Sequence, residues 1–372
     1  MPEKIKLLFV IENSCYGGGE KVFSLLVRNL PKDKFELFCA ALPSGRFYEE
    51  VRGHCRFLPL DLSNLFNLRN IGRLRALLTE NGIQIAHSQG ARADFYCALA
   101  AAKAGVKHAA TVAAPVEVFD VCMARKLAYS ALDSFAARRS AAAITLTPRL
   151  AEMIRGRYAR VEIIPNPVDT GDFSPANFDA APVIEKFNLR GRLVLAALGR
   201  LESFKGHAHL LSALKIVFDT EPELRSRIKC LIAGSGSRDS SLKKQARQAG
   251  LSDSVIFCGE VANPRDFLGA ADIFVMPSLR EGQPLALLEA MAMEKPVLAT
   301  SIPGIADTAE AGREALLVPP AAPAALAEGL LKLAHDMPAA LAMGRAARKK
   351  AEGFGLEKYV QRHVDFYTKI LS

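Results

Sequence analysis

Two cations five residues apart follow a short apolar run in the middle of the chain, within Gly199-Arg200-Leu201-Glu202-Ser203-Phe204-Lys205-Gly206. A planar guanidinium and a compact ammonium in a strand-to-helix turn can converge on one diphosphate. Taken alone, the segment is explained equally well by two exposed surface cations. The spacing therefore indicates either a diphosphate site or a solvated turn.

Two carboxylates lie farther along, Glu281 just before Gly282 and Glu289 eight residues later. Pro284 stands where a first helical turn would begin, which places Glu281 and the N–H groups of the turn at the mouth of a site. A nucleotide sugar needs such N–H groups for phosphate and carboxylates for its hydroxyls. Alternatively, Glu281 is a helix N-terminal carboxylate and Glu289 a surface residue. The apolar neighbours of Glu289 make a solvated role less natural.

A glycine turn, Gly17-Gly18-Gly19, follows the first apolar run. Glycines let the backbone approach a ligand closely, and a helix N-terminus offers N–H groups to an anion. The turn is not G-x-G-x-x-G, and no acidic residue follows the second predicted strand at a ribose-binding distance. A nicotinamide dinucleotide site is therefore disfavoured.

Apolar runs alternate with helix-length amphipathic segments along the chain, which is typical of parallel sheets covered by helices. The first half has predicted strands over 5–11, 36–42, 84–87, 108–112, 142–147 and 162–164, and helices over 21–30 and 71–81. The pattern restarts after Pro165-Asn166-Pro167, with strands over 194–198, 228–233, 255–258, 273–276, 296–300 and 315–318. Two Rossmann-like halves are predicted, with ligands at the carboxyl ends of the strands and a site in the cleft between the halves.

The composition is that of a soluble globular protein, since 50% of the 372 residues are hydrophobic and 23% charged. No apolar stretch is long enough to span a bilayer. The seven cysteines show no CxxC pair or metal-ligand spacing, so neither a zinc site nor a disulfide framework is indicated, and a reducing cytoplasm is expected.

The net charge of +9 is concentrated in the first half, where residues 122–160 contain eight basic and two acidic side chains. Such a run either forms a solvated helix surface or attracts a negatively charged partner. That partner would be anionic lipid headgroups or an acidic acceptor. Nucleic acid is the weaker candidate, because no aromatic interleaving or helix-turn-helix pattern accompanies the arginines.

Six motifs occur in a fixed order: Gly17-Gly18-x-Glu20, Ile164-Pro165-Asn166-Pro167-Val168-Asp169, Gly199-Arg200-Leu-x-x-x-Lys205-Gly206, Ala233-Gly234-Ser235-Gly236, Ala271-Asp272-Ile273-Phe274-Val275-Met276-Pro277-Ser278 and Glu281-x7-Glu289. This order resembles that of glycosyltransferase family 4 over nearly the whole chain. The resemblance implies a GT-B fold, in which two facing Rossmann-like domains with parallel sheets enclose an interdomain cleft. Residues 1–167 would form the acceptor domain, 168–355 the donor domain, and the helix 356–372 would pack back on the first.

The resemblance further implies a retaining, metal-independent transferase without a cofactor, and the chain indeed has no Asp-x-Asp. Arg200 and Lys205 would neutralise the departing diphosphate, while Glu281 would hold the donor sugar. The implied donor-binding residues are Gly17, Gly18, Gly234, Ser235, Gly236, Val261, Gly282, Gln283, Pro284, Leu285 and Glu289. Gln89 and Arg92, in the first half, are assigned to the acceptor.

One position departs from the family. The strand near position 110 usually ends Thr-Val-His, and that His reaches the donor sugar, but here Thr111-Val112 precedes Ala113-Ala114. Ala113 is expected to lower turnover without abolishing donor binding. His87, on the preceding predicted strand, is the nearest replacement by topology, although a lone strand-end His is as often structural as catalytic.

The expected activity is sugar transfer from a nucleoside diphosphate sugar, a UDP-sugar, to a bacterial surface glycan or lipid-linked anionic acceptor such as lipopolysaccharide core. The expected location is the cytoplasm, with peripheral contact to anionic lipid at the inner membrane, and no nucleic acid partner. One alternative is a catalytically impaired nucleotide-sugar-binding protein, favoured only by Ala113. Another is a nucleotide-sugar 2-epimerase, disfavoured by the Arg/Lys pair and Glu-x7-Glu.

Overall fold

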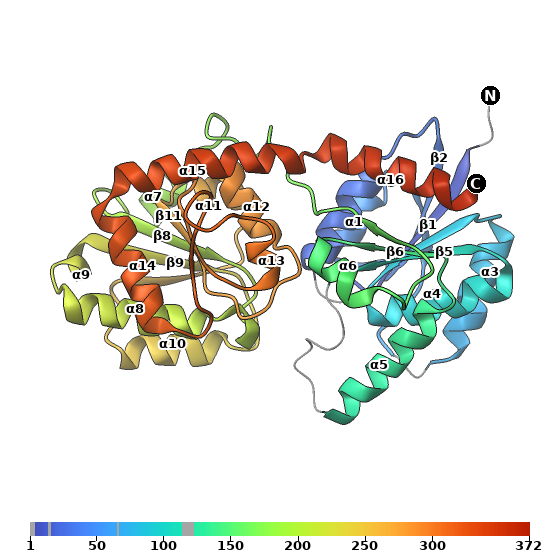
Figure 1. The fold of residues 1–372 in the computed structure, drawn as a ribbon, viewed down its shortest axis with the longest axis horizontal. Coiled ribbons are helices and arrows are strands. Elements are labelled where there is room, and N and C mark those ends of the chain that lie inside the picture. The colour runs from blue at the N-terminus through green and yellow to red at the C-terminus, as the bar shows by residue number, and fades with distance from the viewer. Residues whose placement is uncertain (1–3, 14–15, 65–66, 114–122) are drawn as a thin grey trace. The chain divides into compact units, whose positions relative to one another are not determined.

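The chain divides into two compact units (Figure 1), Met1–Asn166 with Glu357–Ser372 and Pro167–Leu356. The computed structural model describes residues 4–13, 16–64, 67–113 and 123–372. Each unit is built on a parallel sheet with helices on its faces. The predicted class, two parallel α/β domains, is confirmed.

The sheet of the first unit has the strand order β3-β2-β1-β4-β5-β6-β7 within the described residues. Its strands are β1 (Ile5–Ile11), β2 (Phe35–Ala41), β3 (Arg56–Pro59), β4 (Ile85–Gln89), β5 (Lys107–Val112), β6 (Ala142–Thr145) and β7 (Val161–Ile163). Its helices are α1 (Gly18–Asn29), α2 (Gly45–Val51), α3 (Arg69–Glu80), α4 (Ala91–Ala104), α5 (Met123–Ala137), α6 (Pro148–Ile154) and α16 (Leu356–Leu371).

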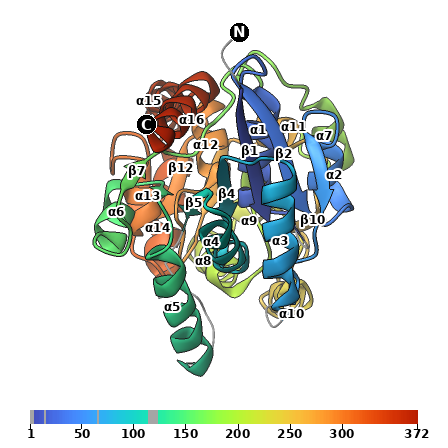
Figure 2. The ribbon, with the colours of Figure 1, turned by 90° about the vertical axis from the view of Figure 1, so that its right-hand side faces the viewer.

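Alternate residues of β1 enter two separate cores, as the period of a strand requires. Leu8 and Val10 pack with buried side chains of α3 and α4. On the opposite face, the ring of Phe9 lies 5.3 Å from that of Phe23 on α1. Helix α5, by contrast, extends away from the rest of its unit in Figures 1 and 2.

Helix α16 is joined to the first unit by a buried polar contact with β4. Both nitrogens of the fully buried His87 are engaged, Nδ1 with the Tyr367 hydroxyl at 2.7 Å and Nε2 with the Thr111 hydroxyl at 2.7 Å. Burial, followed by the nearby rings of His363 and His108, lowers the pKa of His87 well below its usual value. The prediction that His87 is a catalytic replacement is therefore wrong: it is a neutral core residue that fixes α16.

The sheet of the second unit has the order β10-β9-β8-β11-β12-β13 within the part of the chain described. Its strands are β8 (Leu193–Leu198), β9 (Ile228–Ala233), β10 (Val255–Gly259), β11 (Ile273–Met276), β12 (Val297–Thr300) and β13 (Leu316–Val318). Its helices are α7 (Ala181–Lys186), η2 (Ser203–Lys205), α8 (His207–Thr220), α9 (Leu224–Arg227), α10 (Asp239–Gln248), α11 (Pro264–Gly269), α12 (Leu285–Ala292), α13 (Pro303–Ala306), α14 (Pro323–His335), α15 (Met337–Ala351) and η3 (Glu352–Phe354).

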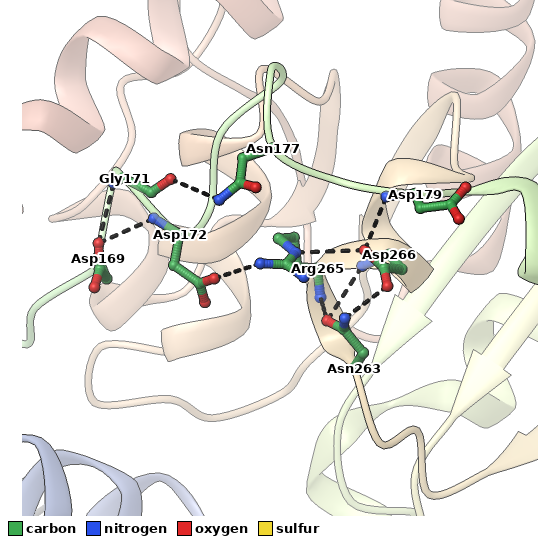
Figure 3. A network of polar contacts seen from close by, with 8 residues as sticks. All are labelled: Asp169, Gly171, Asp172, Asn177, Asp179, Asn263, Arg265 and Asp266. Carbon is green, nitrogen blue, oxygen red and sulfur yellow. Dashed lines mark hydrogen bonds and ion pairs between the residues drawn. The ribbon is translucent and has the colours of Figure 1, made fainter.

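An irregular segment before α7 is fixed on the second unit by side-chain contacts (Figure 3). Asp172 forms an ion pair of 2.6 Å with Arg265, and the N–H of Asp179 donates to Asp266 Oδ1 at 3.1 Å. Asp169 Oδ1 accepts from the N–H of Gly171. The carboxylates of Asp266 and Asp169 thus satisfy backbone N–H groups in a segment without sheet or helix partners.

None of the helices in the described ranges has both the length and the apolar character that a membrane span requires.

Candidate functional site

Neighbouring strands of the second sheet bring Lys205 and Glu281 together. Strands β8 and β11 pair in parallel, so the loops that follow them leave the same edge of the sheet. Lys205 Nζ donates to Glu281 Oε1 at 2.6 Å, and the two side chains are 16% and 9% exposed. Partial burial strengthens this attraction relative to bulk water. Two of the residues expected to bind the donor thus form one ion pair.

Ser278, which the sequence interpretation missed, holds the same carboxylate. Its buried hydroxyl donates to Glu281 Oε1 at 2.8 Å, and its own carbonyl accepts from the Thr300 hydroxyl. Both bonds to Glu281 use Oε1, so Oε2 can accept a hydroxyl hydrogen from a ligand. The spacing Ser-x-x-Glu directly after a strand is the local signal that could have identified Ser278.

Two glycines allow the loops at this edge to touch. A Cβ on Gly206, which has φ +68°, would lie 1.9 Å from the carbonyl oxygen of Pro277. A Cβ on Gly234, with φ +136°, would lie 1.9 Å from the carbonyl oxygen of Gly199. The loops after β8, β9 and β11 therefore approach each other at distances that only glycine permits.

Arg200 and the loops after β9 and β10 complete this edge. Arg200 is exposed in the turn that follows β8. The Glu202 carboxylate accepts from the N–H and the hydroxyl of Ser237, at 3.0 and 2.6 Å. Ser235 Oγ donates to Glu260 at 2.5 Å. The predicted donor-binding residues Gly234, Ser235, Gly236 and Val261 all lie in these two loops.

Helix α12 begins where the sequence predicts, with Pro284 as N-cap and Leu285 as the first helical residue. The preceding Gly282 and Gln283 form the turn after Glu281, and Gln283 is 5% exposed. Glu289 is also only 5% exposed, between the buried Leu288 and Ala290. The interpretation of Glu289 as a surface residue is thus wrong.

The positive charge of the site comes from Lys and Arg. Burial, followed by the charge of Lys205, lowers the pKa of the neighbouring His207 to about 4. The His207 ring is therefore neutral near pH 7 and adds no charge to this edge.

The glycine turn of the first unit is already capped by a carboxylate. Helix α1 begins at Gly18, three residues before its predicted start, and Gly17 is its N-cap. The N–H of Gly17 donates to Glu20 Oε2 at 2.8 Å. An anion at this turn would therefore meet the N–H groups of Gly18 and Gly19 while Glu20 holds Gly17. Ser14 and Cys15 lie outside the described residues.

The residues assigned to the acceptor lie near this turn. Gln89 ends β4, and its Nε2 would be 3.0 Å from a Cβ built on Gly19. Arg92 donates to the carbonyl of Ser63 at 2.8 Å and lies 3.7 Å from Glu12. Ala113 follows β5 directly, and Ala114 lies outside the described residues.

Two family models match successive parts of the chain. The model described as Glycosyltransferase Family 4 matches residues 16–172, and the model described as Glycosyl transferases group 1 matches residues 182–350. The chain belongs to glycosyltransferase family 4.

Curated relatives resemble this family 4 chain over part of their length. A D-inositol 3-phosphate glycosyltransferase of Streptomyces avermitilis is 34% identical over 220 residues, 57% of this chain and 47% of the relative. A 2-deoxystreptamine glucosyltransferase of Streptomyces kanamyceticus is 27% identical over 252 residues, 65% of this chain and 64% of the relative. The chain spans about half the length of the first of these relatives.

Solved structures resemble the fold of the chain along its whole length. Anabaena HepE in complex with UDP-glucose has a TM-score of 0.86 at 19% identity, covering 98% of this chain and 100% of that chain. The lipopolysaccharide outer core galactosyltransferase WaaB has a TM-score of 0.68 at 16% identity, with coverages of 98% and 100%. The fold of this family 4 member is therefore GT-B.

Proposed function

We propose that this family 4 chain is an enzyme that transfers a sugar from a nucleoside diphosphate sugar to a hydroxyl acceptor. The observation that carries the proposal is the Lys205–Glu281 pair of 2.6 Å. It sets an ammonium for a diphosphate beside a carboxylate for sugar hydroxyls, as a nucleotide sugar requires. Arg200, in the same loop as Lys205, would supply the second positive charge.

In the proposed reaction the configuration of the sugar is retained, and no metal ion takes part. The bond from sugar C1 to the phosphate oxygen breaks, and the acceptor oxygen bonds to C1 on the same face. The acceptor proton passes to the departing phosphate. Lys205 and Arg200 stabilise the negative charge that grows on the diphosphate, while Glu281 Oε2 orients the sugar through a hydroxyl.

For the donor we propose a UDP-sugar, and for the acceptor a bacterial surface glycan or a lipid-linked anionic molecule such as lipopolysaccharide core. The complex of HepE with UDP-glucose supports the donor. The galactosyltransferase WaaB, which acts on lipopolysaccharide outer core, supports the acceptor.

We further propose that the first unit contacts anionic membrane through α5. Leu127 and Phe135 on this helix are 66% and 40% exposed, and the Arg139 guanidinium lies 3.5 Å from the Phe135 ring centroid. Apolar side chains beside exposed cations are typical of helices at anionic lipid surfaces. The side chains of Arg125 and Lys126 lie outside the described residues. Equal sedimentation with neutral and anionic vesicles would refute this contact.

Thermal unfolding with UDP, GDP, ADP and their sugars tests the donor, because a ligand at 100 times its Kd stabilises the protein by about 2.7 kcal/mol. We expect the largest shift with UDP compounds.

An assay of nucleoside diphosphate release separates the alternatives. A chain that binds a nucleotide sugar but releases no nucleoside diphosphate with any acceptor would be an impaired binding protein. Proton NMR of the donor alone would reveal an epimerase.

Restoring the family residue at position 113 should raise turnover. We expect Ala113→His to increase kcat about tenfold by adding one hydrogen bond to the donor sugar, with little change in UDP affinity. Initial rates and calorimetric titration with UDP measure the two effects. Ala109→Ser, a polar substitution earlier on β5, is the control. An Ala113→His variant no faster than the parent would contradict the proposed role of this position.

A further inference from the structure

A chain of hydrogen bonds runs through the interior of the first unit. Asp94 Oδ1 lies 2.5 Å from Ser88 Oγ, which lies 2.7 Å from His108 Nε2. On the other side of the ring, His108 Nδ1 lies 2.8 Å from Ser140 Oγ, and the Ser140 hydroxyl donates to the carbonyl of Ala136 at 2.9 Å. All four polar side chains are buried. The chain therefore joins the first turn of α4 to the last turn of α5.

The four contacts of this chain need four hydrogens. Each serine hydroxyl supplies one, and a neutral imidazole supplies one. With a neutral His108, the fourth hydrogen has to come from a protonated carboxyl group of Asp94. Asp94 then donates to Ser88 and Ser88 to Nε2, while Nδ1 donates to Ser140 and Ser140 to the carbonyl.

A doubly protonated His108 would also supply the fourth hydrogen, but burial disfavours it. Burial lowers the pKa of His108 to about 3. Burial also raises the pKa of Asp94 to about 8; the bond from Ser88 opposes this shift, and the charge of Asp133 on α5 adds to it. An imidazolium and a carboxylate separated by a serine would be two buried charges without direct contact, at a large cost in desolvation. The proton is therefore better placed on Asp94.

Other titratable or charged groups lie around the chain. They include Asp133, its ion-pair partner Arg157 at 3.3 Å, Tyr158, Cys97 on α4 and His87 on β4. Burial raises the pKa of Cys97 and of Tyr158 well above their usual values, and it lowers that of His87. These three side chains therefore stay neutral while Asp94 ionises.

We propose that Asp94 carries a proton in the folded protein and that the buried chain is a pH-sensitive switch acting on the end of α5. When Asp94 loses this proton to solvent, three hydrogens remain for four contacts. Ser88 then donates to the carboxylate, and His108 donates from Nε2 to Ser88. Ser140 donates to Nδ1, so the carbonyl of Ala136 loses its hydroxyl donor. That carbonyl keeps its backbone hydrogen bond, and the last turn of α5 is held by one bond fewer.

Unfolding in urea across a range of pH, followed by exchange mass spectrometry on peptides of β5, compares the parent with Asp94→Asn. The asparagine amide supplies the fourth hydrogen at every pH. In the parent, the folded state keeps the proton up to about pH 8, whereas an unfolded aspartate releases it at about pH 4. The stability that the proton provides is therefore complete below about pH 4 and lost progressively up to about pH 8. We expect the unfolding equilibrium constant of the parent, relative to Asp94→Asn, to rise about tenfold per pH unit over this range and then to stay level.

Asp61→Asn is the matched control. Asp61 is an exposed aspartate that is also bonded to a serine, since its Oδ1 accepts from the N–H of Ser63 at 2.8 Å. The bonds from Ser63 lower the pKa of Asp61, so its substitution should change stability equally at every pH above about 5. Infrared spectroscopy of the parent needs no variant. The carbonyl band of a protonated carboxyl group should disappear with a midpoint at about pH 8.

Amide exchange at the end of α5 tests the switch itself. The N–H of Arg139 donates to the carbonyl of Ala136 at 3.0 Å. Relative to Asp94→Asn, this amide of the parent should exchange equally fast at about pH 6 and about 2- to 10-fold faster at about pH 9, as loss of one hydrogen bond requires. Ser140→Ala should exchange faster at both pH values and show no such pH dependence.

Two results would overturn the inference: a stability of the parent relative to Asp94→Asn that is constant from about pH 5 to about pH 8, or relative exchange at Arg139 that is the same at both pH values. The switch goes beyond the proposed function, although Ser88 directly precedes Gln89 and α5 is the helix proposed to contact membrane. None of these measurements uses a nucleotide sugar or a membrane. Failure of the proposed function would therefore leave their results unchanged.

Discussion

Replacing Lys205 with Ala is expected to lower kcat for sugar transfer by about 10²- to 10³-fold, the usual cost of removing one group that stabilises charge in a transition state. The ammonium that would offset the growing charge on the diphosphate is lost. The substitution also leaves the Glu281 carboxylate, 9% exposed, without its ion-pair partner. We therefore expect a loss of stability of about 1–3 kcal/mol beside the loss of rate.

The double variant Lys205→Ala with Glu281→Gln separates the two effects. Neutralising Glu281 removes the unpaired charge, so the free energy of unfolding in urea should recover while kcat stays low. The control is Lys215→Ala, which removes an exposed lysine paired with Asp219 on α8. A Lys205→Ala enzyme with nearly the parent rate would mean that Lys205 serves the fold rather than the reaction.

Much of the strand pattern could be predicted because buried parallel strands are continuous apolar runs. The strands predicted over 5–11, 228–233 and 273–276 are β1, β9 and β11 with the same bounds. In contrast, β3 was missed because it is a four-residue edge strand that begins with the exposed Arg56 and ends at Pro59. Short edges carry little periodic signal.

The end of β4 shows why buried polar residues cause errors in a prediction made from the local apolar pattern. The strand was predicted to end at His87 but continues to Gln89. Ser88 is fully buried, with its hydroxyl 2.5 Å from Asp94 Oδ1 and 2.7 Å from His108 Nε2. These partners come from other elements, so the apolar pattern alone cannot reveal that a serine belongs to the core.

The sequence could predict only those features of the candidate site whose signals lie within one short segment of the chain. The spacings Arg200 to Lys205 and Glu281 to Glu289 each lie within one segment, but the Lys205–Glu281 contact joins residues 76 positions apart. The prediction of a catalytic role for His87 was wrong for the same reason, since its partner Tyr367 lies 280 positions away on α16. The predicted topology placed His87 at the end of a strand, where ligand-binding residues are expected. In the structure α16, which is distant in sequence, packs against His87 instead.

Gly206→Ala is expected to be among the most destabilising single-methyl substitutions in the second unit. The left-handed φ of +68° costs a non-glycine residue about 1–2 kcal/mol. A Cβ 1.9 Å from the Pro277 carbonyl oxygen must also push the loops after β8 and β11 apart, at a further cost of about 1–3 kcal/mol. Because these loops carry Lys205 and Glu281, a shift of about 1 Å should also lower kcat roughly 10²-fold.

Gly191→Ala is the matched control for this substitution. Gly191 has a similar φ of +71°, but a Cβ there would meet no atom within 4 Å. The Gly191→Ala variant should lose only the cost of the left-handed conformation, about 1–2 kcal/mol of the free energy of unfolding in urea. Its kcat should equal that of the parent. The difference between the two variants measures what close contact of the loops contributes. Equal stabilities and equal rates would show that the contact at Gly206 does not hold Lys205 and Glu281 in register.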